Sequence, residues 1–137
     1  MAIDTIGCFM ESKNIIVMDK DTETQQLFSS VIQEMDYTAH VLSTPEELES
    51  VARATRPDLV FINLDDFDER NMHVFRQLHT LDIKLPIFVM TEAQEEVLPL
   101  WHQLCAEAVP FHFIRKPIGE IEIQAFLHSV LGPPYDA

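Results

Sequence analysis

The stretch of sequence that decides the fold runs from residue 57 to residue 66 and reads PDLVFINLDD. Four consecutive apolar residues, Leu59 to Ile62, lie between the turn-forming pair Pro57-Asp58 and an acidic loop. A short apolar run between turn signals is typical of a strand buried on both faces, as in a parallel sheet. Asn63 then stands at the carboxyl end of this strand, where ligands and chemistry gather in open α/β sheets. Asn63 is therefore the first candidate functional residue.

Similar apolar runs recur along the rest of the chain. Four further strands are predicted at residues 15–18, 38–42, 87–90 and 111–114. Between them, apolar residues at a helical period predict five helices. The first is capped by Asp21 or Thr22, the second is capped by Thr44 before Pro45, and the others start near residue 69, near Leu98 and near residue 119.

Strands and helices that alternate along a chain indicate a parallel sheet with helices on both faces. Because crossovers between parallel strands are right-handed, such a chain winds in both directions from its first strand. We expect an α/β fold, a flavodoxin-like three-layer sandwich with a doubly wound five-stranded parallel sheet and five helices. The predicted domain covers residues 14–132, between an N-terminal arm at 1–13 and a C-terminal tail at 133–137.

The composition excludes several classes of protein. The net charge of −14 argues against a nucleic-acid or anionic-membrane surface, because both need clustered Lys and Arg, and it favours a basic partner. No apolar run approaches the roughly 20 residues of a transmembrane helix. Cys8 and Cys105 are too few for a disulfide scaffold, and residues 1–12 lack the basic start of a signal peptide. We expect a cytoplasmic protein that contacts neither nucleic acid nor membrane.

Polar residues follow four of the predicted strands. Because the carboxyl ends of parallel strands meet at one edge of the sheet, we expect the segment Asp19 to Asp21 to meet Asn63, Thr91 and Lys116. With only three glycines, the chain has no Gly-rich phosphate loop and no dinucleotide fingerprint. A nucleophile-elbow motif is also absent from the sequence.

Four motifs at these strand ends resemble the receiver domain of bacterial two-component response regulators. They are IIVMDKD at 15–21, PDLVFIN at 57–63, PIFVMT at 86–91 and FIRKP at 113–117, and the resemblance covers residues 14–131. It implies a phosphorelay protein in which Asp19 helps to organise magnesium, Thr91 senses a phosphoryl group and Lys116 pairs with the phosphoryl oxygens. It also implies a cis peptide between Lys116 and Pro117 and an aromatic switch at Phe113.

Two positions depart from the pattern of that family. Lys20 stands where the second magnesium-binding acid would be, and Asn63 stands where the phosphoaccepting aspartate would be. An amide is not a nucleophile of the carboxylate kind, so aspartyl phosphate cannot form at Asn63. Asp19 and Asp21 then face Lys20 and Lys116, so the charges of the pocket balance without metal. Lys20 either supplies the positive charge of the ion or is a solvated lysine of the loop. We expect magnesium binding to be weak or absent, and no other cofactor.

Several residues have two interpretations. Thr91 and Lys116 either form a phosphoryl pocket or stabilise the fold through Asp19 or Asn63. Asp65 and Asp66 are either a solvated acidic loop or a displaced phosphoacceptor. Phe113 is either a switch or part of the core.

His102 and Cys105 are three positions apart, a spacing that suits half a metal site. Cys105 is predicted on the apolar face of its helix, so we expect core packing there instead.

The sequence favours a pseudo-receiver, a signalling domain that acts by protein–protein interaction without aspartyl phosphorylation and is not an enzyme. Its partner would be a sensor kinase or an output protein. A homodimer through the fourth helix, fifth strand and fifth helix is the other expected contact, although Pro99 and the long segment between Thr91 and Lys116 indicate a remodelled face. Three alternatives remain: a receiver phosphorylated at Asp65 or Asp66, a parent protein phosphorylated at an aspartate replaced here, and a flavodoxin-like small-molecule binder.

Overall fold

A computed structural model describes residues 13–92, 98–106 and 109–132. Five parallel strands form one sheet in the order β2-β1-β3-β4-β5. The order reverses between β1 and β3, which confirms the doubly wound sheet expected from the sequence. The strands are β1 (Asn14–Met18), β2 (Thr38–Leu42), β3 (Leu59–Asn63), β4 (Ile87–Thr91) and β5 (His112–Arg115).

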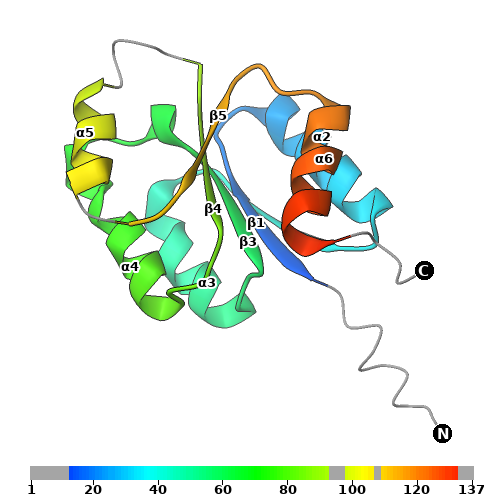
Figure 1. The fold of residues 1–137 in the computed structure, drawn as a ribbon, viewed down its shortest axis with the longest axis horizontal. Coiled ribbons are helices and arrows are strands. Elements are labelled where there is room, and N and C mark those ends of the chain that lie inside the picture. The colour runs from blue at the N-terminus through cyan, green and yellow to red at the C-terminus, as the bar shows by residue number, and fades with distance from the viewer. Residues whose placement is uncertain (1–12, 93–97, 107–108, 133–137) are drawn as a thin grey trace, which may run out of the picture.

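Five α-helices within the described residues cover the two faces of the sheet, as predicted (Figure 1). One face packs against α2 and α6, and the other packs against α3, α4 and α5. The structure is therefore a three-layer α/β sandwich. The helices are α2 (Thr22–Glu34), α3 (Leu48–Thr55), α4 (His73–Leu81), α5 (Leu98–Ala106) and α6 (Glu120–Leu131).

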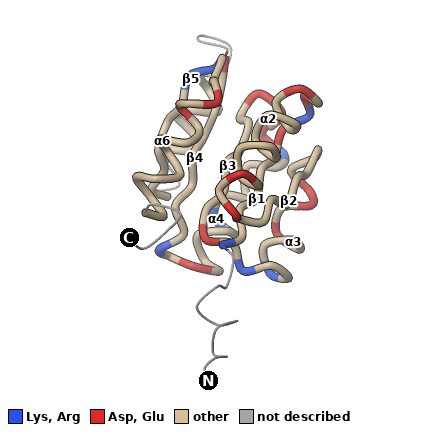
Figure 2. The backbone as a smooth tube through the Cα atoms, turned by 90° about the vertical axis from the view of Figure 1, so that its right-hand side faces the viewer, with Lys and Arg blue, Asp and Glu red and all other residues tan. Residues whose placement is uncertain are grey.

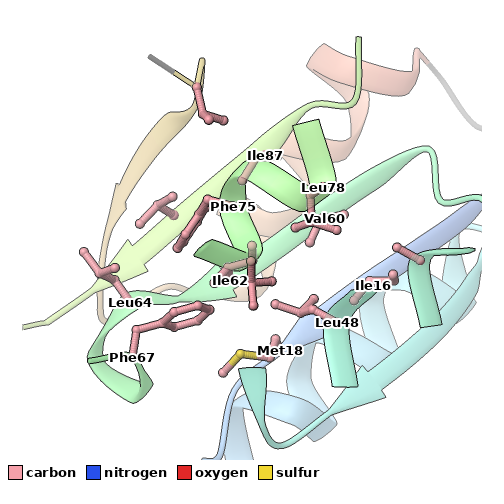
Figure 3. Packing of buried hydrophobic residues seen from close by; sticks show 14 of the residues in the cluster. Ile16, Met18, Leu48, Val60, Ile62, Leu64, Phe67, Phe75, Leu78 and Ile87 are labelled. Carbon is pink, nitrogen blue, oxygen red and sulfur yellow. The ribbon is translucent and has the colours of Figure 1, made fainter. Parts of the chain in front are cut away.

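The central strand β3 is buried along its whole length, as its apolar run predicted. Side chains that alternate along a strand point to opposite faces of the sheet. Phe61 packs on one face between the rings of Phe28 and Phe88, at centroid distances of 4.8 and 5.3 Å. Val60 and Ile62 pack on the other face, in the apolar cluster drawn in Figure 3. The strand therefore joins the two halves of the core.

Two helix starts differ from the prediction. Asp21 caps α2 as expected, because its carboxylate accepts from the backbone of Thr24. Thr44 makes no side-chain cap bond, and a 3₁₀ turn at Pro45–Glu47 comes before α3. The helix predicted from residue 69 likewise begins with a 3₁₀ turn, Glu69–Asn71, before α4. Both apolar patterns were correct, but a tighter turn leads into each helix.

Backbone features at the two ends of the domain agree with the sequence. Gly132 has a φ of 82° and ends α6. Lys116-Pro117 is a cis peptide, as the resemblance implies. No helix among the described residues is long and apolar enough to cross a membrane. The tail predicted at 133–137, and the predicted arm apart from residue 13, lie outside the described residues.

Candidate functional site

An open cavity of about 800 Å³ lies where β1, β3, β4 and β5 end. The residues that line it come from the segments after each of these strands. The four strand ends therefore meet at one edge of the sheet, as predicted from the sequence. Figure 2 shows acidic segments in red beside α2, which starts at this edge. The polar and charged residues that line the cavity are Asp19, Lys20, Asp21, Glu23, Thr24, Asn63, Asp65, Asp66, Glu92 and Lys116.

Asn63 is buried at the centre of this edge, with 5% of its surface exposed. Its side-chain nitrogen donates to Oδ1 of Asp19 at 3.3 Å and to Oδ2 of Asp66 at 2.9 Å. Its side-chain oxygen accepts from the backbone nitrogen of Asp65 at 3.4 Å. Two carboxylates on one side and an N–H on the other leave a single orientation for the amide. Asn63 therefore holds two acidic side chains together by donating to both.

Asp19 is fully buried and forms an ion pair with Lys116. Its Oδ2 lies 2.8 Å from the ammonium of Lys116, whose side chain is 9% exposed. Its Oδ1 accepts from the backbone nitrogen of Asp21 at 2.9 Å as well as from Asn63. A buried charge is tolerated only when it is paired and hydrogen-bonded. These three donors satisfy Asp19 through groups of the chain itself.

Asp21 is exposed and serves mainly as the cap of α2. Its carboxylate accepts from the hydroxyl of Thr24 at 2.6 Å and from the backbone nitrogen of Thr24 at 3.0 Å. The hydrogen bond from the Thr24 hydroxyl, and then the one from its backbone, lower the pKa of Asp21 below its ordinary value of 3.8. The carboxylate of Asp21 therefore lines the cavity without contacting Asn63, and only the backbone nitrogen of Asp21 bonds to Asp19.

Lys20 is exposed, and its ammonium forms no ion pair within the part of the chain that the structure describes. Only its backbone nitrogen is held, by Oδ2 of Asp66 at 2.9 Å. Of the two interpretations of Lys20, the exposed side chain agrees with a solvated loop lysine and not with a substitute for the charge of a metal ion. The group that lies between Asp19 and Asp66 is the side-chain nitrogen of Asn63.

Asp65 and Asp66 belong to the site and are not merely a solvated loop. Asp66 accepts from Asn63 and from the backbone of Lys20. Asp65 accepts from the hydroxyl of Thr91 through Oδ1, and from the backbone nitrogen of Glu92 through Oδ2 at 3.0 Å. The 3₁₀ turn Leu64–Asp66 directs both carboxylates back over the strand ends. The sequence of an acidic pair does not show where its carboxylates point, so these contacts of Asp65 and Asp66 could not be predicted.

The charge balance predicted for the pocket is wrong. Six carboxylates and two lysines line the cavity, which leaves a formal charge of −4. The predicted balance included only two of these carboxylates, those of Asp19 and Asp21. Even so, no three His, Cys, Asp or Glu side chains among the described residues are placed to hold a metal ion. The Asn63 nitrogen, a donor, faces both Asp19 and Asp66, so this arrangement does not fit magnesium, which needs oxygen ligands.

The remaining candidates lie on β4, β5 and α5. Thr91 is buried, with 1% of its surface exposed, and contacts Asp65. Phe113 is 44% exposed, so it is not a core residue, and its ring meets that of Trp101 edge-on at 4.9 Å. Cys105 is exposed, contrary to the prediction of core packing, because the neighbouring Leu104 takes the buried position on α5. His102 is exposed as well.

Comparisons with known proteins agree with this fold. The family described as response regulator receiver domain matches residues 15–128. A comparison with curated proteins found no match. Among solved structures, a CheY-like receiver domain protein from Methanospirillum hungatei has a TM-score of 0.73 at 14% identity and covers 87% of this chain and 93% of its own.

Two further structures show the same likeness. The signal receiver domain of a putative Luxo repressor protein from Vibrio parahaemolyticus has a TM-score of 0.70 at 16% identity, over 88% of this chain and 91% of its own. The RstA receiver domain from Klebsiella pneumoniae has a TM-score of 0.69 at 19% identity, over 87% and 98%. At these identities the likeness concerns the fold alone. The family match covers most of the chain, and the chain therefore belongs to the response regulator receiver domain family of two-component signalling.

Proposed function

We propose that this receiver domain is a pseudo-receiver, which signals through protein contacts without aspartyl phosphorylation at position 63. The observation that carries the proposal is the amide of Asn63, which donates to both Asp19 and Asp66. The nitrogen lone pair of an amide is delocalised and its oxygen carries no full charge, so it does not attack a phosphodonor as a carboxylate does. The side chain at the centre of the site is thus structural.

Weak or absent magnesium binding is the second part of this proposal. A divalent ion at this edge would need oxygen atoms from Asp19 and Asp66, and both already accept from Asn63. Asp19 is further neutralised by Lys116 at 2.8 Å. The ion would have to displace these donors, which lowers its affinity. The formal charge of −4 in the cavity has the opposite effect on magnesium affinity, because it attracts cations.

The proposed partners are proteins. Receiver domains interact with kinases and with output domains, and we propose a sensor kinase or an output protein as the partner here. The net charge of −14 favours a basic surface on that partner. A homodimer through α5, β5 and α6 is the other proposed contact, because the exposed Phe113 and the half-buried Trp101 lie there. We propose a cytoplasmic signalling domain that is not an enzyme.

The alternative is a receiver whose acceptor has moved to Asp65 or Asp66. The observation that favours it is the position of Asp65, whose carboxylate lies at the cavity beside Thr91 and Glu92. Both oxygens of Asp65 already accept hydrogen bonds, and these lower their reactivity as nucleophiles. We therefore rank this alternative second.

Intact mass after incubation with magnesium and acetyl phosphate tests the proposal. The protein is expected to keep its mass, whereas Asn63→Asp, which restores the family's acceptor carboxylate, is the positive control that should gain one phosphoryl group. A phosphoryl group on the unsubstituted protein would overturn the proposal. Its loss in Asp65→Ala or in Asp66→Ala would then identify the displaced acceptor.

A further inference from the structure

A groove of about 560 Å³ lies between the end of α3 and the segment that leads from α4 to β4. These two helices lie side by side on one face of the sheet (Figure 1). The groove is at the amino ends of the strands, because Asp58 and Leu85 line it and come just before β3 and β4. The apolar residues that line it are Ala52, Pro57, Leu81 and Leu85.

Apolar surface at this groove is left uncovered by the rest of the domain. Leu81 lines the groove and is 37% exposed, and Ile83, two residues further along the chain, is 70% exposed. Among the described residues, the other large apolar side chains with such exposure are Phe113 and Ile121. Exposed apolar side chains that gather beside a groove are typical of an interaction surface.

The groove also has a positive charge. Arg56 has a φ of 51° and a ψ of 69°, a left-handed conformation that favours glycine. Its guanidinium makes no ion pair or hydrogen bond with the described residues. Arg56 is therefore available to an acidic group. The other charged residues that line the groove already have partners: Arg53 pairs with Glu49, Asp58 accepts from Asn14 and Asp82 accepts from Lys84.

The start of β1 lies beside the groove. The backbone nitrogen of Asn14 donates to Oδ2 of Asp58 at 2.8 Å, and its side-chain nitrogen donates to the carbonyl oxygen of Thr55 at 3.2 Å. Asp58 lines the groove, and Thr55 is the last residue of α3. On the other side, the carbonyl oxygen of Lys13 accepts from the backbone nitrogen of Thr38 at 2.9 Å. The chain before Lys13 therefore starts from a fixed point next to the groove.

The sequence of the preceding segment matches this surface. Residues 1–12 read MAIDTIGCFMES and combine apolar residues such as Ile6 and Phe9 with the acids Asp4 and Glu11. Glu11 is three residues before Asn14, and three residues span at most about 11 Å.

We propose that the groove between α3 and α4 is the docking site of residues 1–12 of the same chain. Apolar side chains of the segment cover Leu81, and an acid of the segment pairs with Arg56. The interaction goes beyond the proposed function and does not depend on it, because it uses no residue of the cavity at the carboxyl ends of the strands.

A nitroxide attached to Cys8 tests the proposal, because Cys105→Ser leaves Cys8 as the single thiol of the chain. The measurement is the intensity of backbone amide signals in ¹⁵N-labelled protein. We expect the signals of Ala52 and Leu81 to lose most of their intensity and to recover when ascorbate reduces the nitroxide. The signal of Ile121, which is exposed on α6 at the opposite face of the sheet, should keep its intensity.

Two substitutions in the groove should release the segment. Leu81→Asp places a charge on the apolar lining and should restore at least half of the lost intensity. Ile121→Asp is the matched control, because it changes another exposed apolar residue on a different helix, and it should restore none. Arg56→Gly removes the positive charge and favours the observed backbone conformation, so the fold is kept while the loss of intensity becomes smaller.

Unchanged signals at the groove, or a loss of intensity centred on α6, would overturn the inference. Equal effects of Leu81→Asp and Ile121→Asp would do the same. Spin-labelled protein without ¹⁵N, mixed with ¹⁵N-labelled protein in which Cys8 and Cys105 are both replaced by serine, should leave the groove signals unchanged. A loss of intensity in this mixture would show that a second copy fills the groove, contrary to the proposal. The mass measurement for the proposed function is independent of all these results.

Discussion

The side-chain nitrogen of Asn63 lies 2.9 Å from Oδ2 of Asp66 and donates a hydrogen bond to it, where an aspartate at position 63 would repel the Asp66 carboxylate. A carboxylate at position 63 would face both Asp66 and the buried Asp19 with no donor between them. Like charges at such short distances repel, and the repulsion is strong where water is excluded. The amide lets three acidic residues, Asp19, Asp65 and Asp66, surround the end of β3 while each accepts hydrogen bonds.

Asn63→Asp should make stability depend on divalent cations. The substitution removes a donor that serves two carboxylates and adds a third negative charge, so we expect a loss of about 1–3 kcal/mol in the free energy of unfolding. Magnesium should restore part of this loss, because three carboxylates can supply oxygen ligands. Urea unfolding with and without magnesium measures both effects.

The control for this prediction is Asn63→Ala, which removes the same donor without adding charge. Its stability should fall without becoming strongly dependent on magnesium. Equal stabilisation of the unsubstituted protein by magnesium would show that the pocket already binds the ion.

Lys116→Met should destabilise the fold through Asp19. The substitution leaves a fully buried carboxylate without its ammonium partner, and breaking one side of a buried pair costs about 3–5 kcal/mol. Combining it with Asp19→Asn should recover much of the loss, because the uncompensated charge is then gone. Chemical denaturation of the single and double variants provides the measurement.

Lys20→Met is the matched control, because Lys20 is exposed and its ammonium makes no ion pair with the described residues. It should change stability by no more than about 0.5 kcal/mol. A loss as large as that of Lys116→Met would show that Lys20 carries the charge of a missing cation after all.

Phe113→Ala should change the environment of Trp101 without a large loss of stability. Trp101 is the single tryptophan of the chain, and its ring meets Phe113 edge-on at 4.9 Å and Phe111 at 5.1 Å. Removing the Phe113 ring exposes one side of the indole, so emission should shift to longer wavelength. Aromatic pairs of this kind contribute about 0.5–1.5 kcal/mol beyond burial. An unshifted emission maximum would contradict the contact.

Asp21→Ala should lower the melting temperature at neutral pH and have less effect in acid. The folded pKa of Asp21 lies below its ordinary value of 3.8, because the carboxylate accepts from the hydroxyl and backbone of Thr24. Its stabilising effect is therefore present above 3.8 and is lost as the pH falls through the lower, folded pKa. Thermal unfolding at neutral and at acidic pH is the measurement. The difference in melting temperature between Asp21→Ala and the unsubstituted protein should be smaller at acidic pH. A difference in melting temperature that does not change with pH would mean that the Asp21 cap does not act through its charge.

Much of the fold could be predicted from the order of apolar runs. A run such as Leu59 to Ile62 has few alternatives once Pro57 and the acidic loop bound it, and its alternation with helical patterns leads to a parallel sheet. The helix starts at Pro45 and Glu69 were less well predicted, because a 3₁₀ turn and an α-helical turn bury similar apolar patterns.

The sequence by itself determined which strand ends meet, because a parallel sheet brings the carboxyl ends of its strands, and with them Asp19, Asn63, Thr91 and Lys116, to one edge whatever path the loops take. Only the tertiary structure decided which side chains touch there. The Asp65 carboxylate accepts hydrogen bonds from Thr91 and Glu92 at the end of β4, and the Lys20 side chain is exposed. The physical reason is that a loop side chain takes its direction from distant packing. Leu64 and Phe67, buried against the core, aim the carboxylates between them, and no local pattern encodes that direction.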